Sequence, residues 1–248
     1  MTLRLLSYNV RHGGVGREAP LADVIRACEP DLVVLQEASR PEVVERLPAA
    51  RAPAAHPARR GRSLGFMARV PLEEPVWRRP RGSRHAFLEL ALASMRCRIF
   101  GVHLSAVHAA WTERRRVREL RALLAAIRHE QQGFHLLVGD FNTLAPGELL
   151  DVRQLPFRLR PFVWLSGGDI RWRTIQEVLN ARYVDVYRAL HPREPGLTFP
   201  TWNPHVRLDY VFVPELHRGR VTACRVVMGE VAREASDHFP LLAEFTPE

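Results

Sequence analysis

Short apolar runs that end on a polar side chain recur along the chain. The clearest covers residues 136–138 (Leu-Leu-Val), which are followed by Gly139, Asp140 and, two positions later, Asn142. A run of this length bounded by glycine predicts a buried β-strand. Side chains two residues apart on extended backbone project to the same side. We therefore expect Asp140 and Asn142 to face one cation or one reacting phosphate; the alternative is a turn in which both bond nearby backbone amides.

Further predicted strands also carry a polar side chain at or near one end. They are residues 3–8, which lead to Asn9; 32–36, which lead to Glu37; 99–102, which lead to His103; 206–213, which contain Asp209; and the last strand, which Asp237 and His238 precede. The repetition of this pattern favours a shared site at the strand ends over a series of unrelated turns.

Helical periodicity is clearest over residues 111–129, where apolar side chains share one face. Those side chains are Val117, Leu120, Leu123, Leu124 and Ile127. Shorter helices are predicted at about residues 21–28, 41–47 and 174–181, and further strands at 64–70 and 85–92. Residues 48–62 are rich in Ala, Pro and Arg and predict a surface loop. Residues 148–173 interleave Arg with Phe and Trp, a mixture that either grips a nucleic-acid backbone or surrounds core aromatics with surface arginines.

The composition indicates an ordinary globular protein. With 248 residues, 46% hydrophobic and 25% charged, we expect one large α/β domain over residues 1–248. No apolar stretch approaches the roughly 20 residues of a membrane span, and no signal-peptide pattern precedes the first strand. The cysteines, Cys28, Cys97 and Cys224, are far apart, which favours reduced, buried thiols over disulfides or a zinc site. We therefore expect a cytoplasmic protein that does not bind membranes.

A net charge of +9 and a pI of about 10.7 indicate attraction to polyanions. All 36 basic residues are Arg and none is Lys, a bias that a GC-rich genome would also produce. Replacing Lys by Arg leaves net charge unchanged, so the excess of base over acid persists under either explanation. The charge favours a polyanionic partner, and nothing in the sequence indicates a protein partner.

The strand-end motifs together resemble the endonuclease/exonuclease/phosphatase superfamily of metal-dependent phosphoesterases. In chain order they are Ser7-Tyr8-Asn9, Leu35-Gln36-Glu37, Val102-His103-Leu104, Gly139-Asp140-Phe141-Asn142, Arg207-Leu208-Asp209-Tyr210 and Ser236-Asp237-His238. That superfamily includes exonuclease III-type nucleases, deoxyribonucleases, neutral sphingomyelinases and inositol polyphosphate 5-phosphatases. The resemblance implies a four-layer α/β sandwich, in which two mixed β-sheets pack face to face with helices outside and the site lies at one end of the strands.

The resemblance also implies a metal site. Glu37 would be the principal ligand, assisted by Asn9 and by Asp237 directly or through water. Such an oxygen-rich set suits Mg²⁺, with Mn²⁺ able to substitute.

The same resemblance assigns the catalytic groups. Asp140 and Asn142 would orient the attacking water, with Asp140 as the base. His238 would contact the scissile phosphate, and Asp209 would fix its tautomer and favour its charged form. His103 would protonate or stabilise the leaving oxygen.

Three further residues are candidate substrate contacts: Arg11, Arg116 and Trp202. Arg116 lies beside the apolar stripe of the predicted helix at the end near the site. Trp202 belongs to a nuclease-like stretch, Leu197-Thr198-Phe199-Pro200-Thr201-Trp202. Exonuclease III-type enzymes carry an acidic or amide residue where this chain has Arg11, and Tyr where it has His103, which disfavours an abasic-site specialist.

The resemblance therefore implies Mg²⁺-dependent hydrolysis of nucleic-acid phosphodiester bonds by an endonuclease or exonuclease, with nucleic acid as the partner and DNA preferred to RNA. One alternative is a phosphatase or phosphodiesterase that acts on a small phosphorylated or lipid substrate, although no membrane-binding hairpin of a sphingomyelinase is evident. The other is a basic nucleic-acid-binding module without activity, which the complete set of expected ligands and catalytic groups disfavours.

Overall fold

The computed structural model describes residues 2–47, 63–92, 95–155, 157–166, 170 and 172–247. The predicted surface loop at residues 48–62 lies outside the described residues. Within the described part of the chain, no helix is both long and apolar enough to cross a membrane.

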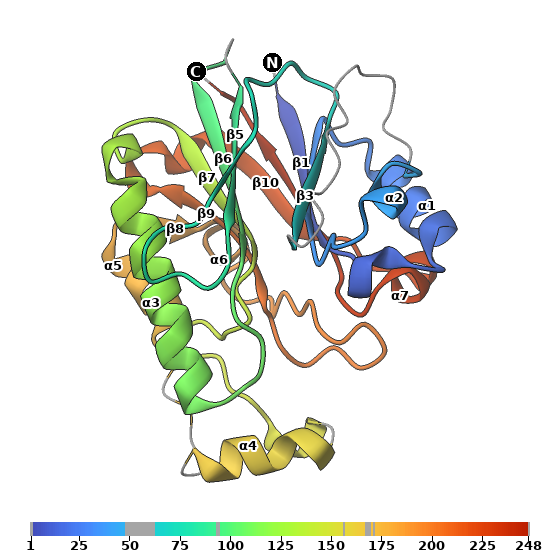
Figure 1. Ribbon diagram of the computed structural model, residues 1–248, viewed down its shortest axis with the longest axis vertical. Coiled ribbons are helices and arrows are strands. Elements are labelled where there is room, and N and C mark those ends of the chain that lie inside the picture. The colour runs from blue at the N-terminus through green and yellow to red at the C-terminus, as the bar shows by residue number, and fades with distance from the viewer. Residues whose placement is uncertain are drawn as a thin grey trace.

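The strands form two mixed sheets (Figure 1). The five-stranded sheet has the order β10 (Val221–Val226), β11 (Leu241–Phe245), β1 (Leu3–Asn9), β2 (Leu32–Gln36) and β3 (Leu64–Ala68). The six-stranded sheet has the order β4 (Val76–Arg78), β5 (Phe87–Leu92), β6 (Cys97–His103), β7 (His135–Asp140), β9 (Asp209–Pro214) and β8 (Tyr183–Asp185). Strands β1 and β2 pair in parallel, as do β6 and β7, and the other neighbours are antiparallel.

Helices cover the outer face of each sheet. The five-stranded sheet carries α1 (Glu18–Cys28), α2 (Pro41–Val44) and α7 (Glu230–Ala235), and the six-stranded sheet carries α3 (Ala110–Ala126) and α5 (Thr174–Asn180). Helix α6 (Val186–Leu190) packs against β9 and β10, while α4 (Arg160–Leu165) lies beyond the N-terminal end of α3 (Figure 1). Short 3₁₀ segments are His12–Gly14, Arg128–Glu130, Val152–Gln154, Phe157–Leu159 and Glu215–Arg220. The predicted four-layer α/β sandwich is confirmed.

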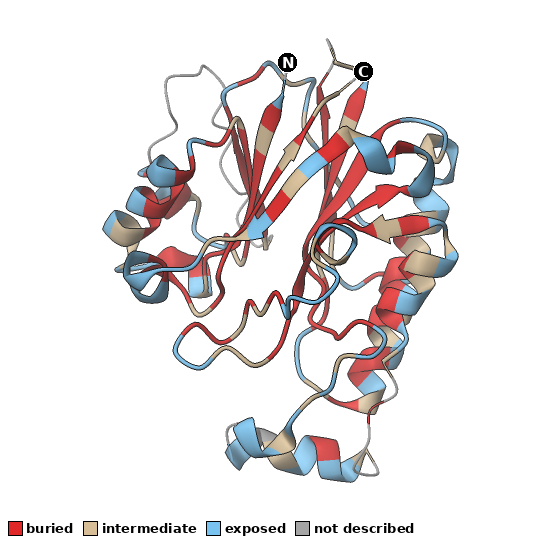
Figure 2. Cartoon of the chain, turned by 180° about the vertical axis from the view of Figure 1, so that it is seen from behind, coloured by how far each residue is buried: buried red, intermediate tan, exposed pale blue. Residues whose placement is uncertain are grey.

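The core explains why the strand sequences are apolar almost throughout. Along β1, Leu3 and Leu5 pack between the two sheets, whereas Leu6 and Tyr8 pack against the helices outside. In β7, Leu136 also faces the other sheet. A central strand that is covered on both faces needs hydrophobic side chains on both. Figure 2 shows the result, with buried residues along the central strands, exposed and intermediate residues along edge strands such as β10, and exposed residues on the outer sides of the helices.

Most predicted elements are confirmed to within a few residues, with two informative differences. The strand expected over 206–213 begins at Asp209, because Arg207 turns inward to bind Glu148 and Asp185. The helix expected over 111–129 ends at Ala126 and continues as a 3₁₀ turn. The sequence analysis also missed the short elements β4, β8, β10, α4, α6 and α7. Cys28, Cys97 and Cys224 are buried and form no disulfide with one another, as expected.

Gly139 allows β6 and β7 to approach closely beside the predicted site. Its φ is +142°, and a Cβ at this position would lie 2.0 Å from the carbonyl oxygen of Val102 on β6. Backbone cannot yield as a flexible side chain can, so only glycine fits here. The pairing that Gly139 permits places His103 opposite Asp140 in register.

We predict that Gly139→Ala destabilises the fold by roughly 2–5 kcal/mol through overpacking and backbone strain. Thermal unfolding provides the measurement, since each kcal/mol corresponds to about 2–4 °C in a protein of this size. Gly219→Ala is the control, because a Cβ there meets nothing within 4 Å and its φ is unexceptional. Equal melting temperatures for both variants would contradict this account of the strand pair.

Candidate active site

Polar side chains from both sheets meet at one edge of the sandwich. Asn9 ends β1, Glu37 follows β2, and His103 and Asp140 end β6 and β7. Because each of these strand pairs is parallel, their carboxyl ends reach the same edge, away from the chain termini (Figure 1). Asp209 begins the antiparallel β9 opposite Asp140 in register. The tertiary structure thus brings together groups that are far apart in the sequence.

Asp140 is buried at the centre of this group. Its Oδ2 accepts hydrogen bonds from the side-chain amides of Asn9 (3.0 Å) and Asn142 (2.9 Å), and its Oδ1 accepts one from the Asn142 backbone N–H (2.8 Å). Burial raises the pKa of Asp140 to about 7, although the His238 charge acts in the opposite direction. The hydrogen bond from the Asn142 backbone N–H to Asp140 forms the turn that the sequence analysis gave as the alternative to a functional site. The same turn holds the side chains of Asp140 and Asn142 at the site.

Asn142 owes its position to a left-handed backbone conformation, φ 53°, which Asn adopts more readily than most residues. Its side-chain amide also donates to the Leu104 carbonyl oxygen at 3.2 Å. The loop after β7 is thereby tied to the loop after β6.

Glu37 is partly exposed and ionised. The Asn9 amide lies 3.5 Å from its Oε1, and the His12 backbone N–H donates to its Oε2 at 2.6 Å. Burial acts to raise the pKa of Glu37, but the His12 hydrogen bond and the positive charge of His238 outweigh it and lower that pKa below its ordinary value. A carboxylate that is ionised near neutral pH therefore stands beside Asn9 at the edge of the site.

His238 and Asp209 form a buried pair. The His238 Nδ1–H donates to Asp209 Oδ2 at 2.9 Å, and its Nε2 lies 4.0 Å from Asp140 Oδ2. Burial acts to lower the pKa of His238, but the carboxylates of Asp209 and Asp140 outweigh it and raise the pKa to about 10. The imidazole is accordingly cationic near neutral pH, with Nε2–H directed toward the other site groups.

His103 has the opposite electrostatic character. Burial lowers its pKa to about 4, so the ring is neutral near pH 7. Its Nε2 lies 3.9 Å from Asp140 Oδ2, and its buried Nδ1 has no hydrogen-bond partner in the described part of the chain. Because this Nδ1 is closed off from solvent, the Nε2 side of the ring is the one that faces the other site groups.

The remaining predicted ligand and substrate contacts lie around this centre. Asp237 Oδ2 lies 3.4 Å from the Arg11 Nε, so these two residues, assigned to metal and substrate, form an ion pair instead of standing apart. Trp202 is 64% exposed on the loop before β9 and packs edge-on against Phe199, whose ring centroid lies 4.7 Å from that of His238.

The structure corrects the assignment of Arg116 as a substrate contact. Its side chain is fully buried on α3, where it pairs with Glu113 at 2.9 Å and donates to the carbonyl oxygens of Ser105 and Val107. The side chain does point toward the loop that follows β6, but it supports that loop from beneath. The i, i+3 spacing of Glu113 and Arg116 was the sequence signal for this pair.

Sequence reasoning also missed groups that surround the site. Ser236 Oγ donates to the Asn9 carbonyl oxygen at 2.6 Å and so joins the last motif to β1. Phe199 covers one side of His238, and the ring of His85 lies 6.0 Å from that of His103. Ser236 and Phe199 belong to motifs noted in the sequence, whereas no sequence pattern pointed to His85.

The residues present fit a hard divalent cation. In the described part of the chain, the ligand atoms of Asp140, Asp209 and His238 lie within 4.8 Å of one another, but His238 is protonated and bound to Asp209. The ionised Glu37 offers oxygen donors of the kind that Mg²⁺ prefers, whereas zinc would call for neutral His or Cys. Asn9 turns its Nδ2 toward Glu37, and its Oδ1 accepts the Arg11 backbone N–H at 2.9 Å, so a role as metal ligand requires this amide to turn over. The donor chemistry on the Glu37 side of Asp140 is compatible with a divalent cation.

A family model described as the Endonuclease/Exonuclease/phosphatase family matches residues 6–238, which include every one of these strand ends.

The chain belongs to this family.

Among curated proteins, none matches the chain by sequence. Solved structures do match it over nearly their whole length. An AP endonuclease from Archaeoglobus fulgidus superposes with a TM-score of 0.72 at 16% identity, covering 98% of this chain and 99% of its own. The 3′ phosphatase NExo from Neisseria, bound to product DNA hairpin, gives 0.72 at 19% identity with 98% and 99% coverage, and a humanized D. rerio TDP2 gives 0.66 at 18% with 99% of each chain covered. At these identities the likeness establishes the fold shared across the endonuclease/exonuclease/phosphatase family.

For this member of the endonuclease/exonuclease/phosphatase family, we predict that His238 stays protonated well above neutral pH when divalent cations are chelated. A folded-state pKa of about 10, above the ordinary 6.5, means that the pair contributes stability that is fully present below pH 6.5 and is lost as the pH rises through about 10. NMR titration of the histidine ring signals tests this directly.

Asp209→Asn should lower the His238 pKa by at least about one unit, because an opposite charge in contact shifts a pKa by roughly 1–3 units. Asp237→Asn is the matched control and should lower that pKa less, since the Asp237 charge contributes less than that of Asp209. Titration of His238 near 6.5 in the unsubstituted protein would contradict the proposed pair.

Proposed function

We propose that the protein is a Mg²⁺-dependent phosphodiesterase that hydrolyses nucleic acid, with DNA the preferred substrate. The observation that carries this proposal is the position of the buried Asp140 carboxylate. It accepts hydrogen bonds from Asn9 and Asn142 and lies 4.0 Å from the cationic His238, while Asn9 also reaches the ionised Glu37. The proposed general base (Asp140), the proposed phosphate-binding group (His238) and the proposed metal ligand (Glu37) are thus adjacent.

Phosphodiester hydrolysis needs an activated water in line with the leaving oxygen and neutralisation of charge on the phosphate. A divalent cation held by Glu37 and Asn9, with Asp237 directly or through water, would supply Lewis-acid neutralisation of that charge. The other requirements fall to side chains of the chain itself.

Asp140 is suited to act as the general base. A carboxyl with a pKa of about 7 is deprotonated often enough near neutral pH to accept a proton from water, yet is far more basic than an ordinary Asp. The bonds from Asn9 and Asn142 fix its orientation, and Asn142 would also orient the water.

The two histidines would contact the phosphate and the leaving oxygen. His238 is held as a cation by Asp209 and would donate Nε2–H to a non-bridging phosphate oxygen, where negative charge develops. His103 is neutral and would donate or accept a hydrogen bond at the leaving oxygen through its Nε2. Both lie within about 4 Å of Asp140, at 4.0 and 3.9 Å, and so border the same small volume.

The substrate assignment draws on charge and on the comparisons. The net charge of +9 favours a polyanion. The matched proteins include an AP endonuclease and a 3′ phosphatase bound to a DNA hairpin. Arg11 and Trp202, which are both solvent-accessible beside the site, remain our proposed substrate contacts.

We expect turnover to need an added divalent cation, because the proposed ligands are oxygen atoms that exchange metal readily. Exhaustive chelation should abolish it, and Mg²⁺ or Mn²⁺ should restore it. Glu37→Gln should reduce activity about a hundredfold or more through loss of the charged ligand. Glu215→Gln, at the far end of β9, is the control and should match the parent. Full activity in chelator would exclude the metal mechanism.

Plasmid DNA, single-stranded RNA, sphingomyelin and inositol phosphates, each tested with Mg²⁺, separate the candidate substrates. Cleavage of DNA supports the proposal. Turnover confined to a small phosphorylated or lipid substrate would replace it with the alternative activity, and binding of DNA without turnover of any substrate would indicate a non-catalytic module.

We also expect Asp209 and His238 to act as one catalytic unit. Either Asp209→Asn or His238→Ala should cripple turnover, and the double variant should be much less damaged than the product of the two single effects, because the second change removes little that remains. Turnover of both single variants and the double variant on one substrate, with melting temperatures as a folding control, measures this coupling. Multiplicative losses would mean that the two residues work independently.

A further inference from the structure

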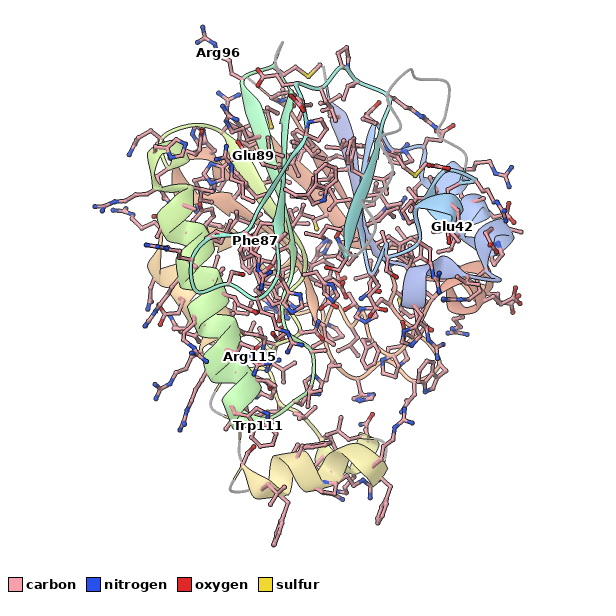
Figure 3. All side chains as sticks on the ribbon, viewed as in Figure 1. Glu42, Phe87, Glu89, Arg96, Trp111 and Arg115 are labelled. Atoms are coloured by element: carbon pink, nitrogen blue, oxygen red, sulfur yellow. The ribbon has the colours of Figure 1, made fainter. Side chains whose placement is uncertain are left out.

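A cavity of about 430 Å³ lies near His103. It is on the side of His103 that faces away from Asp140 and β9. Its lining comes from the segment before β5, the loop after β6 and the first turns of α3, and includes Arg84, His85, Ser105, Trp111 and Arg115. Figure 3 shows Trp111 and Arg115 at the end of α3 that points toward α4. None of the catalytic roles assigned above uses this cavity.

The cavity lies beside the candidate active site. Ser105 follows His103 by two residues, and the His85 ring, which lines the cavity, lies 6.0 Å from the His103 ring. A chain-like substrate whose phosphate reached His103 would therefore extend its next unit toward this cavity.

Two arginines give the cavity a positive charge that the described protein does not neutralise. Within the described residues, neither Arg84 nor Arg115 has a carboxylate within ion-pair distance or a side-chain hydrogen bond. Arg98 on β6, by contrast, pairs with Glu89 and Glu130. Arg115 is also half-buried, a position in which an unpaired guanidinium favours an anionic ligand.

An aromatic side chain stands beside these charges. Trp111 is 44% exposed, and its ring packs edge-on against Phe162 with centroids 6.0 Å apart. Phe162 therefore restrains the indole while much of its surface stays accessible. Arginine beside an exposed, restrained aromatic ring suits a unit that has both a phosphate and a flat base.

The loop that forms the cavity wall is held in a strained conformation. Val107 has φ +79°, which is unfavourable for a β-branched residue. Its carbonyl oxygen accepts hydrogen bonds from Thr112 Oγ1 (2.6 Å) and Arg116 Nη1 (3.0 Å), while Glu119 holds the Ser105 backbone N–H and hydroxyl. The buried Arg116 thus acts on this wall, and the strain indicates a shape maintained for binding.

We propose that this cavity binds one nucleotide of the cleaved strand, adjacent to the scissile phosphate, with its phosphate between Arg84 and Arg115 and its base against Trp111. This inference rests on the proposed nuclease function and adds a defined subsite to it. Arg116 and Glu119 are positioning residues for the subsite, since they hold the loop and do not line the cavity themselves.

The test measures binding of a short fluorescein-labelled oligothymidylate by anisotropy in chelator, over a range of salt concentrations, together with kcat/KM for its cleavage with Mg²⁺. Arg115→Gln should reduce the slope of log affinity against log salt by about 0.7, the value for one lost phosphate contact on a single strand. Trp111→Leu should weaken binding about fivefold or more with no change in slope, because it removes stacking and no charge.

Arg115→Lys should recover the slope, and Arg114→Gln, an exposed neighbour on α3 that does not line this cavity, should match the parent in slope and in kcat/KM. Melting temperatures check each fold, and Arg84→Gln provides a second test of the phosphate contact should Arg115→Gln not fold.

If Arg114→Gln and Arg115→Gln change the slope equally, the charge acts as a diffuse field and the subsite is overturned. Parent-like binding and cleavage by Trp111→Leu would overturn the stacking contact. In both cases cleavage by the parent leaves the nuclease function intact. If the parent neither binds nor cleaves the oligothymidylate but hydrolyses a small phosphate ester, the nuclease function fails and the subsite fails with it.

Discussion

A carboxylate taken out of water is costly unless other groups compensate it, and the burial of Asp140 imposes this requirement on the whole site. Hydrogen bonds from Asn9 and Asn142 and the positive charge of His238 provide the compensation. These groups come from β1, from the loop after β7 and from the segment before β11. The two sheets must therefore pack in one alignment for Asp140 to be tolerated, so the architecture of the sandwich and the chemistry of the site depend on the same contacts.

Burial and charge act differently on each titratable group at this edge. Desolvation dominates for Asp140 and His103 and favours the neutral form of both, whereas Asp209 and Asp140 override it for His238. The Asp140 carboxyl is made more basic, the Glu37 carboxylate stays charged, His103 is neutral and His238 is a cation. Groups whose pKa values are driven apart in this way can serve as a general base, a metal ligand and a hydrogen-bond donor to an anion at a single pH.

Helix α3 supports the site without reaching the reacting groups. Glu113 accepts hydrogen bonds from Thr143 in the loop after β7 and from the N-terminal backbone of α5, and its partner Arg116 holds the loop after β6. A single buried ion pair thus fixes the loops that follow β6 and β7 of the six-stranded sheet. Removing one partner would leave a buried charge uncompensated.

The sequence by itself determined the elements and the chemical types at their ends. Apolar runs that led to Asn9, Glu37, His103 and Asp140 are local signals, because a strand covered on both faces must be hydrophobic throughout and polar side chains appear where it leaves the core. The order of the motifs was also sufficient to indicate the family, which the matching model then established.

Only the tertiary structure decided which of these groups meet and in what ionisation state. Register between β6, β7 and β9 set His103, Asp140 and Asp209 side by side, and the depth of burial set their pKa values. Arg116 shows most clearly what the sequence could not predict. Its position beside the apolar stripe of the helix could be predicted from the sequence, but its burial could not. Pairing across strands and desolvation arise from contacts between residues far apart in the chain, and a local sequence pattern does not specify such contacts.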